Sequence, residues 1–229
     1  MAFPFVTKIA AQAGPQTAFL RSGADLCIYG GAAGGGKTAG LILEPLRHVG
    51  RVANFTAVFF RRTMPQITNP GALWDESLNF YPRLGGTPHL RLREWRWPRS
   101  GKIKFSHLQF ETTVYDWQGA QITLICFDEL THFSAHQFFY MVSRNRSTCG
   151  VRPYIRATCK PGRRLLGRRL SFLVDRPGAR SSDPRVGRGA ALFCPHCRQN
   201  RVGRSTRRTD GRPAPGTGAA AGHRPAAGR

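Results

Sequence analysis

Short apolar runs, each closed by polar or glycine-rich residues, mark out the first 160 residues of the chain. Such runs, rich in aliphatic, aromatic and β-branched residues, are typical of strands that are buried on both faces of a parallel sheet. The strands predicted in this way are residues 26–29, 55–60, 122–127 and 154–159. Because helical segments and polar connections separate them, the pattern predicts an α/β fold with a mainly parallel sheet flanked by helices.

Helical signals fill several of the gaps between the predicted strands. We expect one helix to begin near Ala39, directly after the first strand, and another over Leu73–Phe80. A third follows Ser134 and runs to Val142, because a serine side chain can accept a hydrogen bond from the backbone of the first helical turn. These helices are long enough to cover the faces of the predicted sheet.

The charge is distributed unevenly along the chain, whose formal net charge is +23. Residues 1–160 hold 19 Lys and Arg against 9 Asp and Glu, whereas residues 161–229 hold 16 Arg, no Lys and 3 Asp. The second part is dominated by Arg, Gly, Pro and Ala and shows no sustained hydrophobic period. We therefore expect one α/β domain over residues 1–160 and a low-complexity, disordered basic tail over residues 161–229. A domain this basic is compatible with a nucleic-acid partner.

The sequence also carries signals of cellular location. No apolar run approaches the ~20 residues that a membrane-spanning helix needs, and the first residues lack the pattern of a secretory signal. The six cysteines are scattered, which favours small buried residues in a reducing compartment over disulfides. They are Cys27, Cys126, Cys149, Cys159, Cys194 and Cys197. These observations predict a cytosolic protein without a membrane partner.

A glycine-rich segment, Gly30–Thr38, connects the first strand to the first helix. It fits the pattern G-x-x-x-x-G-K-[ST] in the strand–loop–helix setting that a phosphate-binding loop needs. The glycines let successive backbone N–H groups turn toward phosphates, and the start of the helix adds partial positive charge. A glycine-rich turn that happens to precede Lys-Thr is the alternative. The residues expected to contact the nucleotide are Gly31, Gly34, Gly35, Gly36, Lys37 and Thr38.

Two adjacent carboxylates, Asp128 and Glu129, close the predicted strand 122–127. Two charges at the end of a buried strand are costly unless they face a cation or a cleft. We expect Asp128 and the hydroxyl of Thr38 to hold Mg²⁺, while Glu129 polarises the water that attacks ATP. Lys37, at the β- and γ-phosphates, and Glu129 are the expected catalytic residues.

Other polar residues near these motifs have two interpretations each. Gln16 can hydrogen-bond the edge of an adenine through its amide, or it is an ordinary surface residue. Arg61 and Arg62 end a predicted strand, and ligands of open α/β sheets bind at such strand ends. The two arginines therefore face the nucleotide or DNA. The alternative is that they form a solvated strand end. Thr158, at the polar end of the last predicted strand, could sense the γ-phosphate.

For several further basic and aromatic residues, the sequence does not decide what they contact. Arg144 and Arg146 are candidates for stabilising γ-phosphate charge, within the subunit or from a neighbouring one, or they are surface residues. Residues 92–97 and 102–108 predict a β-hairpin with one basic face. Its residues Trp95 and Trp97 face DNA, or they pack on the core, as is usual in an amphipathic hairpin.

These segments, in this order, resemble the large terminase subunits of tailed bacteriophages, the ATPases that pump DNA into procapsids. The resemblance covers residues ~15–160. It rests on Gln16, the glycine loop, Phe59–Thr63, Trp117–Ile122, Phe127–Phe133, Ser143–Ser147 and Arg156–Cys159. It implies a P-loop NTPase fold of the ASCE type, in which Gln16 contacts adenine, Gly31–Thr38 is the Walker A loop and Asp128-Glu129 is the Walker B motif. Thr158 begins the segment that corresponds to the coupling motif.

The resemblance also implies ATP and Mg²⁺ as cofactors and double-stranded DNA as the substrate. By the same resemblance, the partners are the small terminase subunit and the portal protein. A ring-shaped homo-oligomer would assemble on the procapsid in the host cytoplasm.

The chain departs from the family pattern in three places. Ala32-Ala33 stand where some terminases carry an arginine, and Lys160 stands where the coupling motif usually has an asparagine. After residue 160 the chain has three Asp and no Glu, too few carboxylates for the metal site of an RNase H-like nuclease domain. We therefore expect an incomplete core without its last strand, and no nuclease activity.

A shifted reading frame accounts for the last two departures. The codons for Asn-Pro-Asp with one inserted base read Lys160-Pro161-Gly162. Permissive codons for Gly162–Arg176, read one frame over, give the family-like peptide DADSWVADFLSWWID, and Ser182–Cys194 behaves in the same way. The pair Cys194 and Cys197 is then an accident of the frame, and a lone C-x-x-C is a weak zinc signal. The nucleotide sequence of the encoding DNA tests this hypothesis.

The leading hypothesis is the ATP-binding and ATP-hydrolysing part of a viral DNA-packaging motor, with activity impaired by truncation. One alternative is a non-catalytic fragment that binds nucleic acid through its Arg-rich tail. Another is a different P-loop nucleic-acid motor, such as a helicase.

Overall fold

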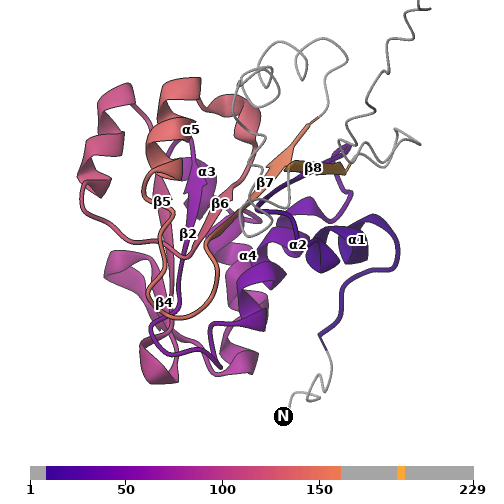
Figure 1. The fold of residues 1–229 in the computed structure, drawn as a ribbon. Coiled ribbons are helices and arrows are strands. Elements are labelled where there is room, and N and C mark those ends of the chain that lie inside the picture. The colour runs from indigo at the N-terminus through magenta and orange to yellow at the C-terminus, as the bar shows by residue number, and fades with distance from the viewer. Residues whose placement is uncertain (1–8, 161–189, 194–229) are drawn as a thin grey trace, which may run out of the picture.

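A single sheet with helices on both faces forms the described part of the protein (Figure 1). The computed structural model describes residues 9–160 and residues 190–193. The strands are β1 (Leu26–Gly30), β2 (Thr56–Arg61), β3 (Thr87–His89), β4 (Glu94–Arg96), β5 (Lys102–His107), β6 (Leu124–Phe127), β7 (Tyr154–Cys159) and β8 (Ala190–Phe193). Their order is β3-β4-β5-β2-β6-β7-β1-β8. Only β4 pairs antiparallel, with β3 and with β5, so the mainly parallel α/β sheet is confirmed.

Helices connect the strands and cover both faces of the sheet. The α-helices are α1 (Pro15–Arg21), α2 (Lys37–Leu43), α3 (Pro65–Thr68), α4 (Leu73–Phe80) and α5 (Ala135–Val142). The 3₁₀ helices are η1 (Glu44–Arg47), η2 (Pro82–Leu84), η3 (Leu90–Leu92), η4 (Pro98–Ser100), η5 (Glu111–Trp117) and η6 (Leu130–His132). The two helices predicted over residues 73–80 and from Ser134 to Val142 are found at these positions, as α4 and α5.

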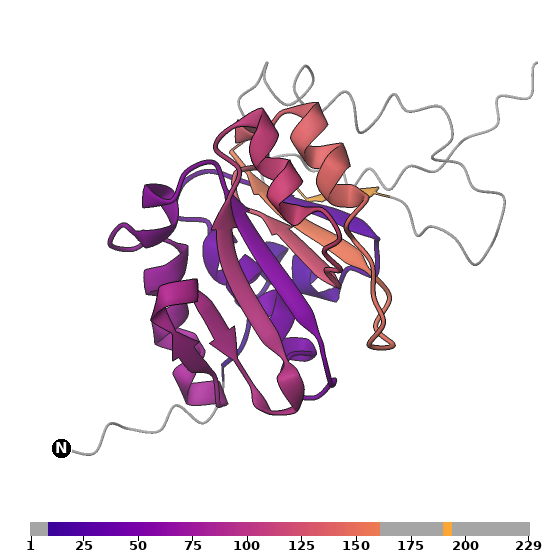
Figure 2. The same ribbon diagram turned by 90° about the vertical axis from the view of Figure 1, so that its left-hand side faces the viewer.

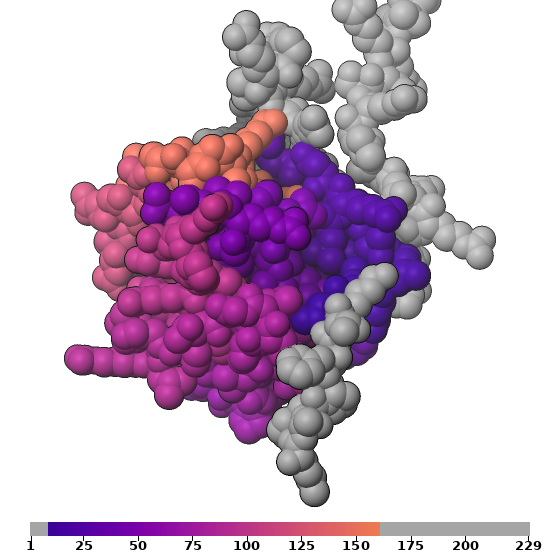
Figure 3. All heavy atoms as spheres, turned by 90° about the horizontal axis from the view of Figure 1, so that it is seen from below, coloured from indigo at the N-terminus to yellow at the C-terminus, as the bar shows by residue number. Residues whose placement is uncertain are grey.

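Two hydrophobic cores lie on opposite faces of the sheet, because successive strand residues point to opposite sides. Phe59 packs in the core beneath α1, α2 and α4, and its neighbour Phe60 packs in the core beneath α5 and η5. Figures 1 and 2 show α1, α2 and α4 on one side of the sheet and α5 on the other. In Figure 3 the indigo N-terminal segment lies beside the magenta segment around residue 100 on one continuous surface.

The hairpin formed by β4 and β5 packs its tryptophans inward. Trp95 is fully buried and Trp97 nearly so. The indole N–H of Trp95 donates to Ser77 Oγ at 2.9 Å, and that of Trp97 donates to the Leu84 carbonyl at 2.9 Å. The polar atom of each ring therefore has a partner while the ring fills the core. The interpretation of these tryptophans as core residues is confirmed, and the DNA-facing one is wrong.

Helix α1 and strand β8 are among the elements that were not predicted from the sequence. Helix α1 follows Gly14, and no side chain caps its start, so the usual helix-start signal is missing. Strand β8 pairs in parallel with β1, with Leu26 opposite Ala190 and Tyr29 opposite Phe193. The expectation that the core lacks a strand after residue 160 is therefore wrong for these four residues. They form an apolar run, and the outer edge of β1 offers backbone N–H and C=O groups to such a segment.

The remaining expectations for the tail concern residues 161–189 and 194–229, which lie outside the described residues, as do Cys194 and Cys197. Of the other four cysteines, Cys27, Cys126 and Cys159 are buried as predicted. No helix in the part of the chain that the structure describes is long and apolar enough to span a membrane.

Helix α5 begins with the predicted cap. Ser134 Oγ accepts the N–H of Gln137 at 3.1 Å, and Gln137 Oε1 accepts the N–H of Ser134 at 3.2 Å, which is a capping box. The amide of Gln137 also donates to the carbonyls of Leu108 and Phe110, each at 3.0 Å. This helix start therefore holds the segment after β5 against α5.

We expect Ser134→Ala to lower the free energy of unfolding by about 1 kcal/mol, because the first helical turn loses its acceptor. Urea denaturation of the full chain measures this change. Ser143→Ala, at the exposed other end of the same helix, is the matched control and should change stability by less than about 0.5 kcal/mol. Equal effects of the two substitutions would contradict the capping role.

Candidate functional site

The predicted site residues meet at one edge of the sheet. The parallel strands β1, β2, β6 and β7 all end there, at Gly30, Arg61, Phe127 and Cys159. Backbone bonds join these ends, since the N–H of Gly31 donates to the Cys159 carbonyl at 3.2 Å. The carboxyl ends of parallel strands are the usual place for a ligand in an open α/β sheet. Segments that lie far apart in the sequence thus come together as the motif order predicts.

The glycine loop is bent by residues in the left-handed region. Gly34 has φ of 78° and Gly36 has φ of 67°, conformations that glycine adopts without steric cost. A Cβ on Gly36 would also lie 2.9 Å from Gln16 Nε2, so this position excludes a side chain on two grounds. The hydroxyl of Tyr29 donates to the Gly35 carbonyl at 2.8 Å and ties the loop to β1.

Gln16 anchors the loop from α1. Its side-chain Nε2 donates to the Gly36 carbonyl at 2.8 Å, and its Oε1 accepts the N–H of Gln12 at 2.6 Å. Only 3% of the residue is exposed, so the interpretation as an ordinary surface residue is wrong. One amide hydrogen and one lone pair stay available for a base edge, and an adenine contact remains a prediction.

Lys37 is folded back onto the loop that it follows. Its ammonium group donates to the carbonyls of Gly31 at 2.9 Å and of Ala32 at 2.6 Å, and the residue is 7% exposed. A buried ammonium needs such acceptors when no anion is beside it. Phosphate oxygens are stronger acceptors than carbonyls because they are charged. The group is therefore placed to exchange loop carbonyls for phosphates.

Asp128 is held on both sides at the end of β6. Its Oδ1 accepts the hydroxyl of Thr158 at 2.5 Å, and its Oδ2 lies 2.7 Å from Nε of Arg61 as an ion pair. The residue is 2% exposed, so water does not solvate the carboxylate and these two partners stabilise its charge instead. Arg61 thus lies at the candidate site, against the carboxylate.

Glu129 adopts a backbone conformation that is rare for residues other than glycine, with φ of 59° and ψ of 63°. Strain of this kind gathers at functional sites and costs of order 1–3 kcal/mol. The N–H of Glu129 donates to Thr158 Oγ1 at 3.0 Å, and its Oε2 accepts the backbone N–H of Lys160 at 3.1 Å. Thr158 in β7 therefore fixes the backbone of Glu129, and Lys160 just after β7 fixes its carboxylate.

Lys160 stands where the coupling motif usually has an asparagine, but its contact with Glu129 does not depend on the side chain. Because the backbone N–H makes the bond, the substitution of lysine for asparagine leaves this contact intact. The sequence gives no signal for such a backbone role. Tyr29, which supports the site through its hydroxyl, was also missed, because an aromatic residue within an apolar strand looks like a core residue.

The oxygen atoms available here fit a magnesium ion that is held jointly with phosphates. Mg²⁺ is usually bound by one or two protein ligands, with phosphates and water in the other positions. Thr38 follows Lys37 in the first turn of α2, and the carboxylate oxygens of Asp128 keep lone pairs beyond those used by Thr158 and Arg61. No group of three or more His, Cys, Asp or Glu among the described residues could hold a metal by itself. Thr38 and Asp128 would therefore need phosphate oxygens and water to complete the coordination of an ion.

The other candidate arginines lie away from this cluster. Arg62 Nη1 donates to Gln137 Oε1 at 2.6 Å and so turns toward α5. Arg144 and Arg146 exchange backbone bonds with Ile122 at the amino end of β6. Six residues of extended chain separate Ile122 from Asp128, about 20 Å. The prediction that Arg144 or Arg146 reaches the γ-phosphate within the subunit is therefore wrong, because they lie at the opposite edge of the sheet.

Comparisons with known proteins agree with this arrangement. The sequence model of the family described as "Terminase large subunit, T4likevirus-type, N-terminal" matches residues 28–165, more than half of the chain. No curated protein matches the sequence.

Two solved structures share the fold. The large terminase of a thermophilic bacteriophage is similar with a TM-score of 0.52 at 14% identity, over 64% of this chain and 38% of that one. The large terminase ATPase domain of Thermus phage P74-26 is similar with a TM-score of 0.51 at 13% identity, over 80% of each chain. This chain thus spans well under half of the first of these proteins. From the family match and the shared fold, the chain belongs to the terminase large subunit family and carries the N-terminal part of such a protein.

Proposed function

We propose that the chain binds ATP with Mg²⁺ at the carboxyl edge of its sheet and hydrolyses it as part of a viral DNA-packaging motor. The observation that carries the proposal is that the glycine loop with Lys37 and the pair Asp128 and Glu129 held by the Thr158 hydroxyl follow neighbouring strand ends at one edge of the sheet. A phosphate-binding cation, a magnesium ligand and a water-orienting carboxylate are the groups that phosphoryl transfer to water requires. The large terminase of the thermophilic bacteriophage has been solved in complex with ADP and with ATP-γ-S, which agrees with this proposal.

The residues of the loop bind and orient the phosphates. The N–H groups of residues 32–38 face the phosphates, and Lys37 gives up the carbonyls of Gly31 and Ala32 for the β- and γ-phosphates. Thr38 and Asp128 hold Mg²⁺, which when bound neutralises charge on the phosphates.

Glu129 acts on the other side of the γ-phosphate. Its carboxylate accepts a hydrogen bond from the attacking water and aligns it, and the Lys160 N–H keeps the carboxylate in place. Thr158 holds both Glu129 and Asp128 through one hydroxyl, so a change at the phosphates that moves Asp128 also acts on Glu129 and on β7. We infer that Thr158 senses the γ-phosphate in this indirect way.

Arg61 supplies the positive charge beside Asp128 before Mg²⁺ binds. The Asp128 carboxylate would hold the ion together with Thr38, and Arg61, 2.7 Å from that carboxylate, would lie beside the phosphates. An arginine from a neighbouring subunit of a ring would complete the charge around the γ-phosphate, because Ala32-Ala33 leave the loop without one.

Double-stranded DNA is the proposed substrate, and the charge of the segment between η2 and β5 supports it. Residues 83–104 carry seven Lys and Arg and only one acidic residue, Glu94. Glu94 is buried and paired with Arg96 at 2.7 Å, so the exposed charge of the segment is positive. Lys and Arg on one surface attract phosphates and release counterions. The small terminase subunit, the portal protein and a ring assembly in the host cytoplasm are proposed on family grounds.

We expect Lys37→Ala to lower the affinity for ATP by about 10- to 100-fold, because a charged hydrogen bond to phosphate is lost. Fluorescence titration with a labelled ATP analogue measures the affinity, and a filter-binding assay measures DNA binding. Lys102→Ala, which removes an exposed lysine on β5, is the control and should keep full ATP affinity. DNA binding without any ATP binding would favour the alternative of a basic nucleic-acid-binding fragment. Unchanged ATP affinity in Lys37→Ala would show that the glycine loop is not the phosphate site.

We expect Glu129→Gln to keep ATP affinity and to lower kcat by about 100-fold or more, because the amide no longer polarises the attacking water. Steady-state phosphate release and nucleotide titration measure the two quantities. Glu76→Gln on α4 removes a carboxylate far from the site and should leave both unchanged. Hydrolysis at the wild-type rate in Glu129→Gln would assign the water-orienting role to another residue.

A further inference from the structure

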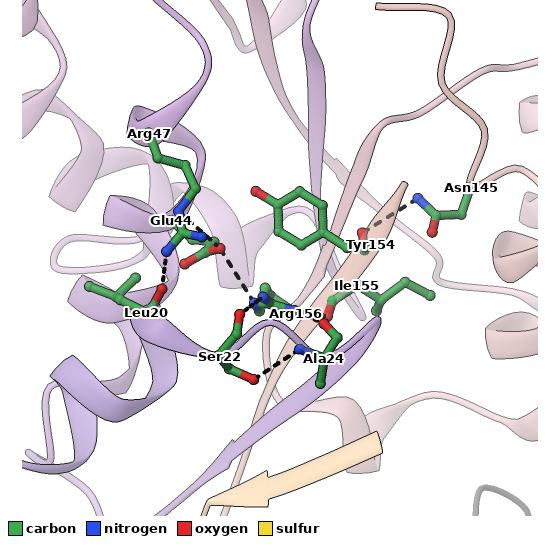
Figure 4. Close-up of polar contacts among 9 residues, drawn as sticks. All are labelled: Leu20, Ser22, Ala24, Glu44, Arg47, Asn145, Tyr154, Ile155 and Arg156. Atoms are coloured by element: carbon green, nitrogen blue, oxygen red, sulfur yellow. Dashed lines mark hydrogen bonds and ion pairs between the residues drawn. The ribbon is translucent and has the colours of Figure 1, made fainter. Parts of the chain in front are cut away.

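A buried ion pair joins the C-terminal end of α2 to the middle of β7, away from the nucleotide site. Glu44 is the C-cap of α2 and is fully buried, and Arg156 lies in the middle of β7 with 2% of its surface exposed. Arg156 Nε lies 3.4 Å from Glu44 Oε1. Figure 4 shows the two side chains pointing toward one another from η1 and β7. Neither residue belongs to the predicted site or contacts it directly.

Arg156 is fixed on every side. Its Nη1 donates to the carbonyls of Ala24 at 2.9 Å and Ile155 at 3.0 Å, and its Nη2 donates to the Ser22 carbonyl at 2.8 Å. The guanidinium also lies 4.7 Å from the centre of the Tyr154 ring. A planar guanidinium held in this way has one orientation, so it is a rigid reference point on β7.

Glu44 is held less well, and its burial is costly. Its second neighbour, Arg47, lies 3.6 Å away and is itself bonded to the Leu20 carbonyl. Within the described residues, neither carboxylate oxygen of Glu44 makes a hydrogen bond of normal geometry. Burial raises the pKa of Glu44 although both arginines act in the opposite direction. Buried pairs of this kind often contribute little to stability, and apolar residues of similar volume serve as well.

The pair connects two elements that both lead to the nucleotide site. Lys37 is the first residue of α2 and Glu44 closes it, so the helix carries a displacement at one end to the other, about 10 Å away. On β7, Arg156 precedes Thr158 by two residues, and Thr158 holds Asp128 and Glu129. At the site itself, the backbone bond from Gly31 to Cys159 and the pairing of Gly30 with Cys159 link the loop to β7.

We propose that Glu44 and Arg156 are positioning residues, which fix α2 along β7 and thereby set the distance from the phosphate loop to Asp128 and Glu129. The proposal rests on the proposed function, because it concerns the geometry of the same nucleotide site. When Lys37 exchanges carbonyls for phosphates, the loop moves and pulls on α2. The pair resists sliding of α2, so the strain reaches β7 and Thr158.

The test replaces the pair in the full chain by apolar residues, Glu44→Leu with Arg156→Met. A groove of about 190 Å³ beside Ser22 and Ala24 admits water to the carbonyls that lose Arg156. We expect kcat for ATP hydrolysis to fall by about ten-fold or more, because small displacements of reacting groups are costly. The KM for ATP should stay within about three-fold, and the melting temperature should change little.

The neighbouring ion pair provides the matched control. Asp25 and Arg152 lie 2.9 Å apart at the rim of the same groove, but both are partly exposed and neither contacts α2. Asp25→Asn with Arg152→Gln should leave kcat and KM unchanged. If the apolar double variant does not fold, Glu44→Gln keeps the shape, removes the charge and should lower kcat in the same direction.

Three results would overturn the proposal: wild-type kcat in the folded variants, a loss confined to KM, or an equal loss in the control. If the wild-type chain binds no ATP, the proposed function fails and hydrogen exchange decides the positioning role. Faster amide exchange over residues 30–38 in the double variant, but not in the control, would support it. Unchanged exchange would reject it.

Discussion

The burial of the Asp128 charge is the constraint on which the site depends. A carboxylate that is 2% exposed must find its partners inside the protein. It finds them on two neighbouring strands, in Arg61 at the end of β2 and Thr158 at the end of β7. The parallel register of β2, β6 and β7 is therefore required by the charge as well as by the apolar strands.

Charge is thus buried at two places along β7, and the two clusters share that strand. Arg61 and Asp128 lie at its carboxyl end, and Glu44 and Arg156 lie toward its amino end. Apolar residues could fill either place at no loss of stability. Directional contacts, by contrast, fix how the elements sit along one another. This is the property that a site built from a loop, a helix and three strand ends requires.

The segment after β7 combines a site residue and a departure from the family pattern. Lys160 still supports Glu129, because a backbone N–H is present whatever the side chain. Further on, β8 lies on the outer edge of β1 although the surrounding sequence lacks a hydrophobic period. In both cases backbone groups form hydrogen bonds at positions where the side-chain pattern gives no signal of a partner.

The sequence by itself determined the strand and helix order, the glycine loop and the carboxylate pair, because local periodicity and motif spacing encode them. Tertiary structure decided the pairings of side chains that lie more than a hundred residues apart, as in Arg156 with Glu44. It also placed Arg61 against Asp128 and moved Arg144 to the opposite edge. Periodicity shows that a residue ends a strand. The side chain that it contacts there depends on which strands are neighbours, and this order arises only when the sheet assembles.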